Sequence, residues 1–319
     1  MRIINIALVG SGELGSRHLQ SLIGTENASI TVVEPSGVSV EMSRKRISES
    51  NVVNKSSIVF VNDVKSLPTE IDFVVIATGA GPRLSIMSDI LSHARVKYLL
   101  LEKVLFQSVE DYAKAKQIIE SKNVKVWVNC PRRMFQFYSS IKLNLNKSNP
   151  IIMAVKGGSW GLACNSIHFI DIFSFLTESK VVRVFNDGLE NKIYPSKRQG
   201  YVEFFGVLTV TFENNHVLKL DCTHGTMPME IAIHSIDGTY NIDEASGTIF
   251  YNGKKSNIEV LVKFQSELTH SVLDEALSFG QSKLTSFDEA CEYHIPIIKS
   301  LLSFYNKTEG LDASILPIT

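Results

Sequence analysis

The sequence has few cysteines, no long apolar run and almost no net charge. Its four cysteines, Cys130, Cys164, Cys222 and Cys291, lie far apart without a CxxC pair. Zinc-finger and redox motifs are therefore excluded, no metal site is predicted, and a reducing cytoplasmic location is expected. Lys and Arg total 32 against 33 Asp and Glu, which argues against a nucleic-acid-binding surface. No stretch reaches the ~18 consecutive apolar residues of a membrane-spanning helix, so a membrane partner is not expected either.

The length of 319 residues predicts about two domains at ~150 residues each. The first part of the chain alternates short apolar runs with helical patterns, which predicts a Rossmann-type, doubly wound parallel sheet covered on both faces. The expected strands are 3–9, 30–33, 58–61, 73–77, 98–101 and 124–128, and the expected helices are 16–23, 39–50, 83–94 and 108–121. We place the end of this α/β domain at residue 128.

After that point strands follow one another without intervening helices, which predicts an α+β domain with an open, mostly antiparallel sheet over residues 129–319. A helix is expected at 165–177 and two more at 266–279 and 286–306. The expected strands are 201–212, 216–222, 229–235, 247–251 and 257–264.

Residues 10–15 form a GxGxxG motif, GSGELG, between the first strand and the first helix. In such a motif the first glycine permits the tight turn, the second lets backbone approach a pyrophosphate, and the third lets helix and strand pack closely. The motif predicts dinucleotide binding, although a glycine turn that only packs is the alternative. The predicted cofactor contacts are Gly10, Gly12, Glu13, Leu14 and Gly15.

Two further positions suit the same cofactor. Glu34 ends the second strand, where a carboxylate accepts hydrogen bonds from ribose hydroxyls and repels a 2′-phosphate, so NAD is favoured over NADP. A solvated glutamate is the alternative, and the basic residues 44–46 leave NADP open. Thr78 and Gly79 follow the fourth strand, where a cofactor can lie close to the backbone, but a plain glycine turn is equally consistent.

The chain resembles the glucose-fructose oxidoreductase / inositol dehydrogenase (Gfo/Idh/MocA) family over essentially its whole length. Four blocks carry the resemblance by their order and spacing: the glycine motif extended to His18, residues 76–78, Glu102-Lys103, and residues 161–176. The resemblance implies a dinucleotide domain over 1–128 and a domain for substrate binding and oligomerisation over 129–319. It also implies sugars, polyols or nucleotide-activated sugars as substrates, and a homodimer or homotetramer formed through the second sheet.

Two departures from the family pattern bear on catalysis. The family's usual Glu-Lys-Pro is here Glu102-Lys103-Val104, which keeps the lysine but lacks the proline. The family commonly has an aspartate four residues before its catalytic histidine, and here Cys164 stands four residues before His168. Asn165 is adjacent and can orient an imidazole, but it supplies no carboxylate.

The expected chemistry is oxidation of a secondary alcohol. Lys103, at the end of a strand, would stabilise a developing alkoxide, and His168 would accept the hydroxyl proton; a solvated lysine and a core histidine are the alternatives. The resemblance places Glu102 at the cofactor. Asn165 and Asp171 share a helical face with His168 and are expected near the substrate. Arg133 would bind substrate oxygens or phosphate, or form an interdomain salt bridge.

The sequence therefore predicts an NAD-dependent oxidoreductase that acts on a CH–OH group of a sugar, polyol or nucleotide-activated sugar. Two alternatives stay open. The first is a non-catalytic, NAD-bound sensor or regulator. The second is an enzyme that uses bound NAD for a net non-redox reaction of a sugar.

Overall fold

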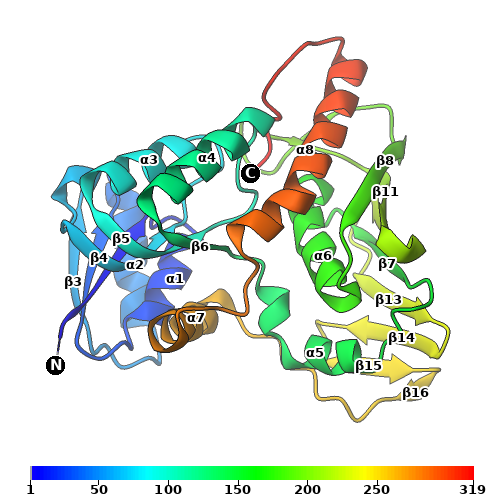
Figure 1. Cartoon of the computed structure of the whole chain (residues 1–319), viewed down its shortest axis with the longest axis horizontal. Helices are drawn as coiled ribbons and strands as arrows, with labels where there is room; N and C mark the ends of the chain where they lie inside the picture. Colours follow the sequence, from blue (N-terminus) through cyan, green and yellow to red (C-terminus); the bar gives the residue numbers. More distant parts are fainter. Residues whose placement is uncertain (1) are drawn as a thin grey trace. The chain divides into compact units, whose positions relative to one another are not determined.

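The computed structural model describes residues 2–319, and contacts between residues divide them into two units (Figure 1). The N-terminal unit comprises the residues up to Phe106, with Glu110–Asn129 and Lys263–Phe287. The C-terminal unit comprises Gln107–Val109, Cys130–Val262 and Asp288–Thr319. Within residues 2–319, no helix is both long and apolar enough to cross a membrane.

The N-terminal unit is built on a parallel sheet in the order β3-β2-β1-β4-β5-β6. Its central strands are almost continuously apolar, and their side chains are buried on both faces, as expected for a sheet that helices cover on both sides. This confirms the predicted doubly wound fold. The strands are β1 (Ile4–Val9), β2 (Ala28–Val33), β3 (Ser57–Val61), β4 (Glu70–Ile76), β5 (Arg95–Leu101) and β6 (Lys125–Val128).

Helices α3 and α4 cover one face of this sheet, and α1, α2 and α7 lie on the other (Figure 1). Their bounds are α1 (Gly15–Leu22), α2 (Gly37–Ser48), α3 (Arg83–His93), α4 (Val109–Lys122) and α7 (Gln265–Phe279), with a short 3-10 turn, η1 (Val64–Ser66), before β4.

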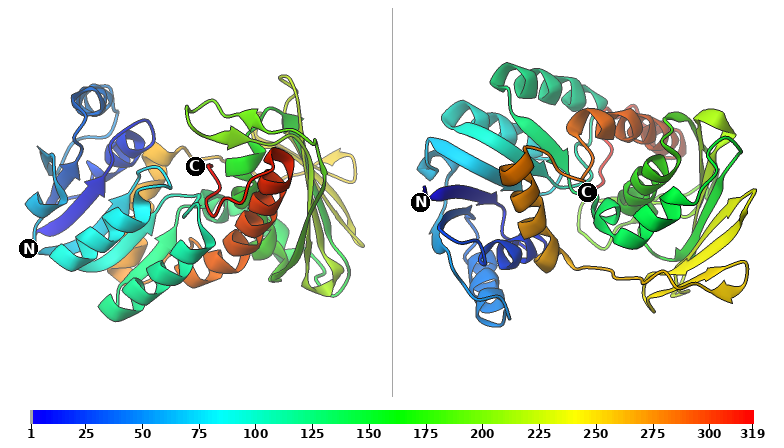
Figure 2. Two further views of the ribbon diagram at one scale, coloured as in Figure 1. Left: turned by 90° about the horizontal axis from the view of Figure 1, so that it is seen from above. Right: turned by 60° about the horizontal axis from the view of Figure 1, so that its bottom comes forward.

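Helix α7 lies far along the sequence but packs beside α1 in the N-terminal unit (Figure 2). The contact is polar as well as apolar: the backbone amide of His270 donates to Ser21 Oγ over 2.9 Å, and Thr269 Oγ1 lies 2.8 Å from His18 Nδ1. This differs from the predicted boundary, which assigns every residue after 128 to the second domain. The difference arises because the chain returns to the first sheet after completing the second.

The C-terminal unit contains a mixed, mostly antiparallel sheet in the order β16-β15-β14-β13-β7-β12-β11-β8, which confirms the predicted sheet class. The β7–β12 pair is parallel. A short ribbon pairs β9 with β10. The strands are β7 (Ile152–Gly158), β8 (Val181–Leu189), β9 (Tyr194–Pro195), β10 (Val202–Glu203), β11 (Gly206–Phe212), β12 (Val217–Thr223), β13 (Glu230–Ser235), β14 (Gly238–Asp243), β15 (Thr248–Tyr251) and β16 (Lys254–Lys255).

Helices α6 and α8 pack against one face of this second sheet, and α5 lies beside α6 (Figure 1). Their apolar side chains form the core of the unit, in which Ile167, Phe173 and Leu301 are fully buried. The helical segments are η2 (Pro131–Met134), α5 (Gln136–Leu143), α6 (Leu162–Thr177), η3 (Glu213–Asn215) and α8 (Phe287–Glu309).

The strand predictions for this unit were only partly correct. The segment predicted as a strand at 257–264 lies outside every strand of the described residues and instead connects β16 to α7. Its apolar alternation favours an extended backbone, but an extended backbone becomes a strand only where a neighbour supplies hydrogen bonds. Conversely, the predicted strands do not include β7, β8, β9, β14 or β16. Residues 201–212 form two strands rather than one.

Candidate functional site

In the N-terminal unit, the loops that follow β1 and β4 lie side by side. The strand order reverses between these two neighbouring strands, and open α/β sheets bind ligands outside the carboxyl ends of the strands at such a point. The contact is direct, since a Cβ added to Gly10 would lie 2.9 Å from Cγ2 of Thr78. The glycine motif and Thr78-Gly79 therefore share one edge of the sheet, as predicted for a cofactor site.

The three glycines of the motif have different surroundings. Gly10 has a left-handed backbone with φ of +84°, which favours glycine at the turn. A Cβ at Gly15 would lie 1.9 Å from the carbonyl oxygen of Gly10, so only glycine allows this helix and strand to approach so closely. A Cβ at Gly12 would meet no atom within 4 Å among the described residues. Gly12 therefore leaves room for a ligand.

Polar groups without partners gather around that space. The backbone amides of Gly12 and Glu13 donate to no acceptor within residues 2–319. Ser11 Oγ and Thr78 Oγ1 are buried and likewise lack a partner in the described part of the chain. Helix α1 starts at Gly15 without a side-chain cap. Amides and hydroxyls at a helix N-terminus are the donors that bind phosphate, so the residues present fit the pyrophosphate of a dinucleotide.

Glu34 lies beside this loop and is 8% exposed. Its Oε2 accepts a 2.7 Å hydrogen bond from the amide of Ser11, and its Oε1 accepts a 2.9 Å bond from the amide of Ser36. A carboxylate offers about four acceptor positions, so capacity for ribose hydroxyls remains. The Glu34 carboxylate thus holds the loop in place, and its contact with ribose stays a prediction.

The basic residues of α2 already have partners in the structure. Arg46 bonds to the side chain and the carbonyl of Glu13 in the glycine motif, a contact that the sequence analysis missed. Arg44 lies over the ring of Phe60, with its guanidinium carbon 4.9 Å from the ring centroid. Lys45 Nζ lies 3.8 Å from a carboxylate oxygen of Glu49. Arg46 is therefore committed to the glycine motif, whereas the contacts of Arg44 and Lys45 are those of exposed side chains and contribute at most about 1 kcal/mol each.

Lys103 is half-buried just beyond the end of β5, and its peptide bond to Val104 is cis. The preceding Glu102 is 3% exposed, and its Oε1 lies 2.9 Å from His18 Nε2 and also accepts from Asn129 Nδ2. Burial raises the pKa of Glu102, but the hydrogen bonds from His18 and Asn129 and the charge of Lys103 bring that pKa below its usual value. The Glu102 carboxylate is thus engaged inside the fold, and a cofactor contact at this position would fall to its main chain.

In the C-terminal unit, α6 carries Asn165 and His168, and both are half-buried. The helix follows Gly161, whose backbone is left-handed with φ of +84°. Asn165 Nδ2 donates a 2.7 Å bond to the carbonyl of Trp160, so this amide ties the helix to the loop before it. The carboxylate of Glu203 accepts the amide of Ala163 over 2.6 Å, which stabilises the first turn of α6.

Asp171 and Arg133 do not have the substrate-binding surroundings predicted for them. Asp171 is fully buried; its Oδ2 accepts from Arg133 Nε over 2.9 Å, and its Oδ1 accepts from the hydroxyl of Tyr293 over 2.8 Å. Arg133 also bonds Glu289 over 2.7 Å. These partners belong to the C-terminal unit, so the expected interdomain salt bridge is corrected to one within a unit. Burial raises the pKa of Asp171 to about 6, while Arg133 and Tyr293 act in the opposite direction.

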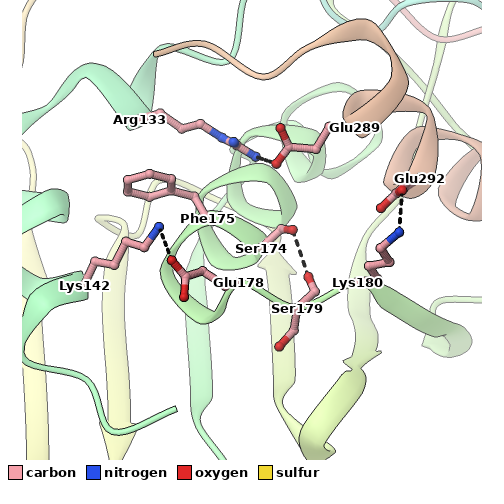
Figure 3. A pocket seen from close by; sticks show the side chains of 9 residues that line it. All are labelled: Arg133, Lys142, Ser174, Phe175, Glu178, Ser179, Lys180, Glu289 and Glu292. Carbon is pink, nitrogen blue, oxygen red and sulfur yellow. Dashed lines mark hydrogen bonds and ion pairs between the residues drawn. The ribbon is translucent and has the colours of Figure 1, made fainter.

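A groove of about 370 Å³ lies at the other end of α6 from its first turn (Figure 3). Its charged side chains pair with one another: Arg133 with Glu289, Lys142 with Glu178, and Lys180 with Glu292. Because each cation that lines the groove already has a carboxylate partner, its chemistry does not resemble that of an anion site. None of the predicted catalytic residues lines it.

The N-terminal part of the chain matches a known protein family. Residues 4–130 match the oxidoreductase family Gfo/Idh/MocA, which has an NAD-binding Rossmann fold. The resemblance predicted from the sequence is confirmed over these residues, which match this family. A comparison with curated proteins gave no match.

Solved structures extend the similarity of fold to the whole chain. UDP-N-acetylglucosamine 3-dehydrogenase from Acidithiobacillus ferrooxidans is 13% identical with a TM-score of 0.73, over 95% of this chain and 98% of that one. Apo scyllo-inositol dehydrogenase from Lactobacillus casei is 17% identical with a TM-score of 0.68, over 96% and 97%. A super-repressor mutant of Gal80p from Saccharomyces cerevisiae is 14% identical with a TM-score of 0.69, also over 96% and 97%. At identities this low the likeness shows the fold alone.

Proposed function

We propose that this protein is an NAD-dependent oxidoreductase that acts on a CH–OH group of a sugar, a polyol or a nucleotide-activated sugar. The carrying observation is the open space at Gly12, bordered by backbone amides and by the buried hydroxyls of Ser11 and Thr78 that lack partners in the described chain. It lies in the segment that matches an NAD-binding family. In the proposal, these groups bind the pyrophosphate.

The negative charge of Glu34 supports NAD rather than NADP as the cofactor. The Glu34 carboxylate stands at the end of β2 beside the glycine motif, where it would accept ribose hydroxyls and repel a 2′-phosphate. The nearby cations of α2 could oppose that repulsion, but Arg46 is bonded to Glu13, and Arg44 and Lys45 have partners of their own. A 2′-phosphate would therefore have to displace the Arg46–Glu13 interaction and would lie near the Glu34 carboxylate.

The proposed chemistry uses three side chains. When bound, the nicotinamide would accept a hydride from the substrate carbon. Lys103 stabilises the negative charge that develops on the hydroxyl oxygen, and His168 accepts the hydroxyl proton. Asn165 holds the first turn of the helix that carries His168, through its bond to Trp160, and is the remaining candidate for contact with substrate.

The substrate class rests on similarity of fold. Of the structural neighbours, one is a dehydrogenase of UDP-N-acetylglucosamine and another a dehydrogenase of scyllo-inositol. Both substrates carry ring hydroxyls on secondary carbons. We therefore extend the proposal to that class of alcohol, with the protein acting as a homodimer or homotetramer.

A second candidate function is that of an NAD-bound sensor without catalysis. It is favoured by Cys164, which stands where the family commonly has an aspartate four residues before the histidine, and by the similarity of fold to the super-repressor mutant of Gal80p. Under this alternative, NAD binds but no substrate is oxidised.

One experiment separates the two candidates. The purified protein is incubated with NAD and a panel of sugars, polyols and nucleotide sugars, and NADH is followed by absorbance. Turnover that falls by about 10²–10³ in Lys103→Met, with NAD affinity kept within threefold, supports the oxidoreductase. Tight NAD binding without NADH formation supports the sensor when product analysis also shows every sugar of the panel unchanged, since altered sugar without NADH would indicate a net non-redox reaction. Wild-type rates in Lys103→Met would remove that residue from the mechanism.

A further inference from the structure

Arg83 is the most unusual buried charge in the N-terminal unit. It is the first residue of α3 and is 1% exposed. A cation in the first turn of a helix is opposed by the helix dipole, and a buried charge is tolerated only when its hydrogen bonds are made. Because the charge does not stabilise the helix, the role of the side chain lies in the hydrogen bonds that it makes.

The hydrogen bonds of Arg83 join two loops. Its Nη1 donates to the carbonyls of Val104 and Leu105, the latter over 2.8 Å, and its Nη2 donates to the carbonyl of Thr78. Val104 immediately follows Lys103, and Thr78 lies against the glycine motif. One planar guanidinium thus bridges the loop after β5 to the loop after β4, as its fixed fork of donors allows.

The segment that carries Lys103 is consequently held on both sides. On the amino side, the Glu102 carboxylate is bound by His18 and Asn129. On the carboxyl side, the carbonyls of Val104 and Leu105 are bound by Arg83. Val104 has no ring to restrict its backbone, so hydrogen bonds rather than covalent geometry hold this side.

We propose that Arg83 is the positioning residue for Lys103: its guanidinium fixes the 103–105 backbone relative to the loop after β4, and thereby the Lys103 amine. The inference rests on the proposed function, because it assigns Arg83 to the reaction in which Lys103 acts. A misplacement of about 1 Å at a reacting group can lower a rate by about 10²-fold. Loss of the Arg83 hydrogen bonds should therefore lower the rate of the reaction more than the affinity for the cofactor.

Three variants test the proposal. Arg83→Met removes the donors, and Arg83→Lys keeps the charge but not the fork. Arg95→Met is the matched control, because Arg95 is an exposed arginine at the opposite end of β5. Hydrogen exchange of the amides in residues 102–106 is measured first, together with the rate at which Lys103 is acylated as a function of pH. Neither measurement requires turnover.

We expect exchange in 102–106 to accelerate at least tenfold in Arg83→Met, less in Arg83→Lys, and not in the control. The pH profile of Lys103 acylation should shift most in Arg83→Met, less in Arg83→Lys, and not in the control. In the active enzyme, kcat should fall by about 10²-fold in Arg83→Met and by less in Arg83→Lys, while the Kd for NAD stays within threefold. If Arg83→Met does not fold, the lysine variant decides by the same measurements.

Unchanged exchange and acylation in a folded Arg83 variant would overturn the proposal. So would faster exchange accompanied by a wild-type kcat, since Arg83 would then order the loop without serving Lys103. A wild-type protein that turns over no substrate would contradict the proposed function instead. In that case the acylation profile still decides whether Arg83 places the amine.

Discussion

The backbone amide of Ser11 donates a 2.7 Å hydrogen bond to Oε2 of Glu34. This bond joins the two parts of the predicted cofactor site, the glycine motif after β1 and the acid after β2, through the protein itself. Glu34 therefore holds the loop, and its proposed second role in selecting the nucleotide can be tested separately.

Glu34→Gln should weaken both roles to different degrees. The amide oxygen of glutamine can accept from only one of the two backbone amides, which should lower the free energy of unfolding by about 1–2 kcal/mol. Loss of the negative charge should reduce the preference for NAD over NADP at least tenfold, measured as the ratio of the two Kd values. Glu41→Gln, on the exposed face of α2, is the control. An unchanged ratio would show that Glu34 does not select the nucleotide.

The glycines of the motif should respond differently to alanine. Gly15→Ala places a methyl group against the carbonyl of Gly10 and should cost roughly 2 kcal/mol or more in unfolding free energy. Gly12→Ala meets no atom of the described chain, so it should leave thermal stability unchanged while weakening NAD binding at least tenfold. Gly37→Ala, equally open, should change neither. Normal NAD affinity in Gly12→Ala would place the pyrophosphate elsewhere.

Asp171 should make the stability of the protein depend on pH. Its folded-state pKa of about 6 lies above the ordinary value of 3.8, so the folded state holds this proton more tightly than the unfolded chain does. The contribution is therefore fully present below pH 4 and is lost as pH rises through 6, by at most about 3 kcal/mol. Chemical denaturation of wild type and Asp171→Asn at pH 4.5 and pH 7.5 measures it. A difference between the two proteins that does not change with pH would contradict the assignment.

Variants of His168 and Cys164 test the proposed proton transfer. His168→Gln removes the base and should lower kcat by about 10²–10⁴-fold. Cys164→Asp places a carboxylate one helical turn before His168, where it can orient the imidazole, and should raise kcat severalfold. Cys164→Ser, similar in size but without the charge, is the control. A fall in kcat in the aspartate variant would indicate that the cysteine is part of the site as it stands.

The N-terminal fold was predictable because its signals are local. The apolar run of β1, the glycines that follow it and Glu34 each depend on neighbours close in sequence, and the parallel pairing follows from the alternation of strand and helix. The return of α7 to this unit was not predictable. It depends on contacts such as that between Thr269 and His18, which lie far apart in sequence and carry no pattern of their own.

In the second domain, too, the contacts of the predicted site residues could not be inferred from local sequence. Asp171 and Arg133 have the residue types that bind sugars and phosphates, and only the three-dimensional contacts reveal that they bind each other. The unusual position of Arg83 is indicated by the sequence, because an arginine directly after Gly81-Pro82 stands at a helix start, where its charge opposes the helix dipole. Strand β7 was harder to predict, because residues 152–155 are all apolar and two glycines follow Lys156, so the alternating burial of the strand has no matching alternation of residue types.

Every step of the proposed reaction requires that the loop at Gly12 binds NAD. Isothermal titration calorimetry of the folded protein with NAD and with NADP tests it most directly. We expect one site per chain with a Kd for NAD on the order of 1–100 μM, and weaker binding of NADP. Absence of heat with either nucleotide, in protein shown by circular dichroism to be folded, would contradict it.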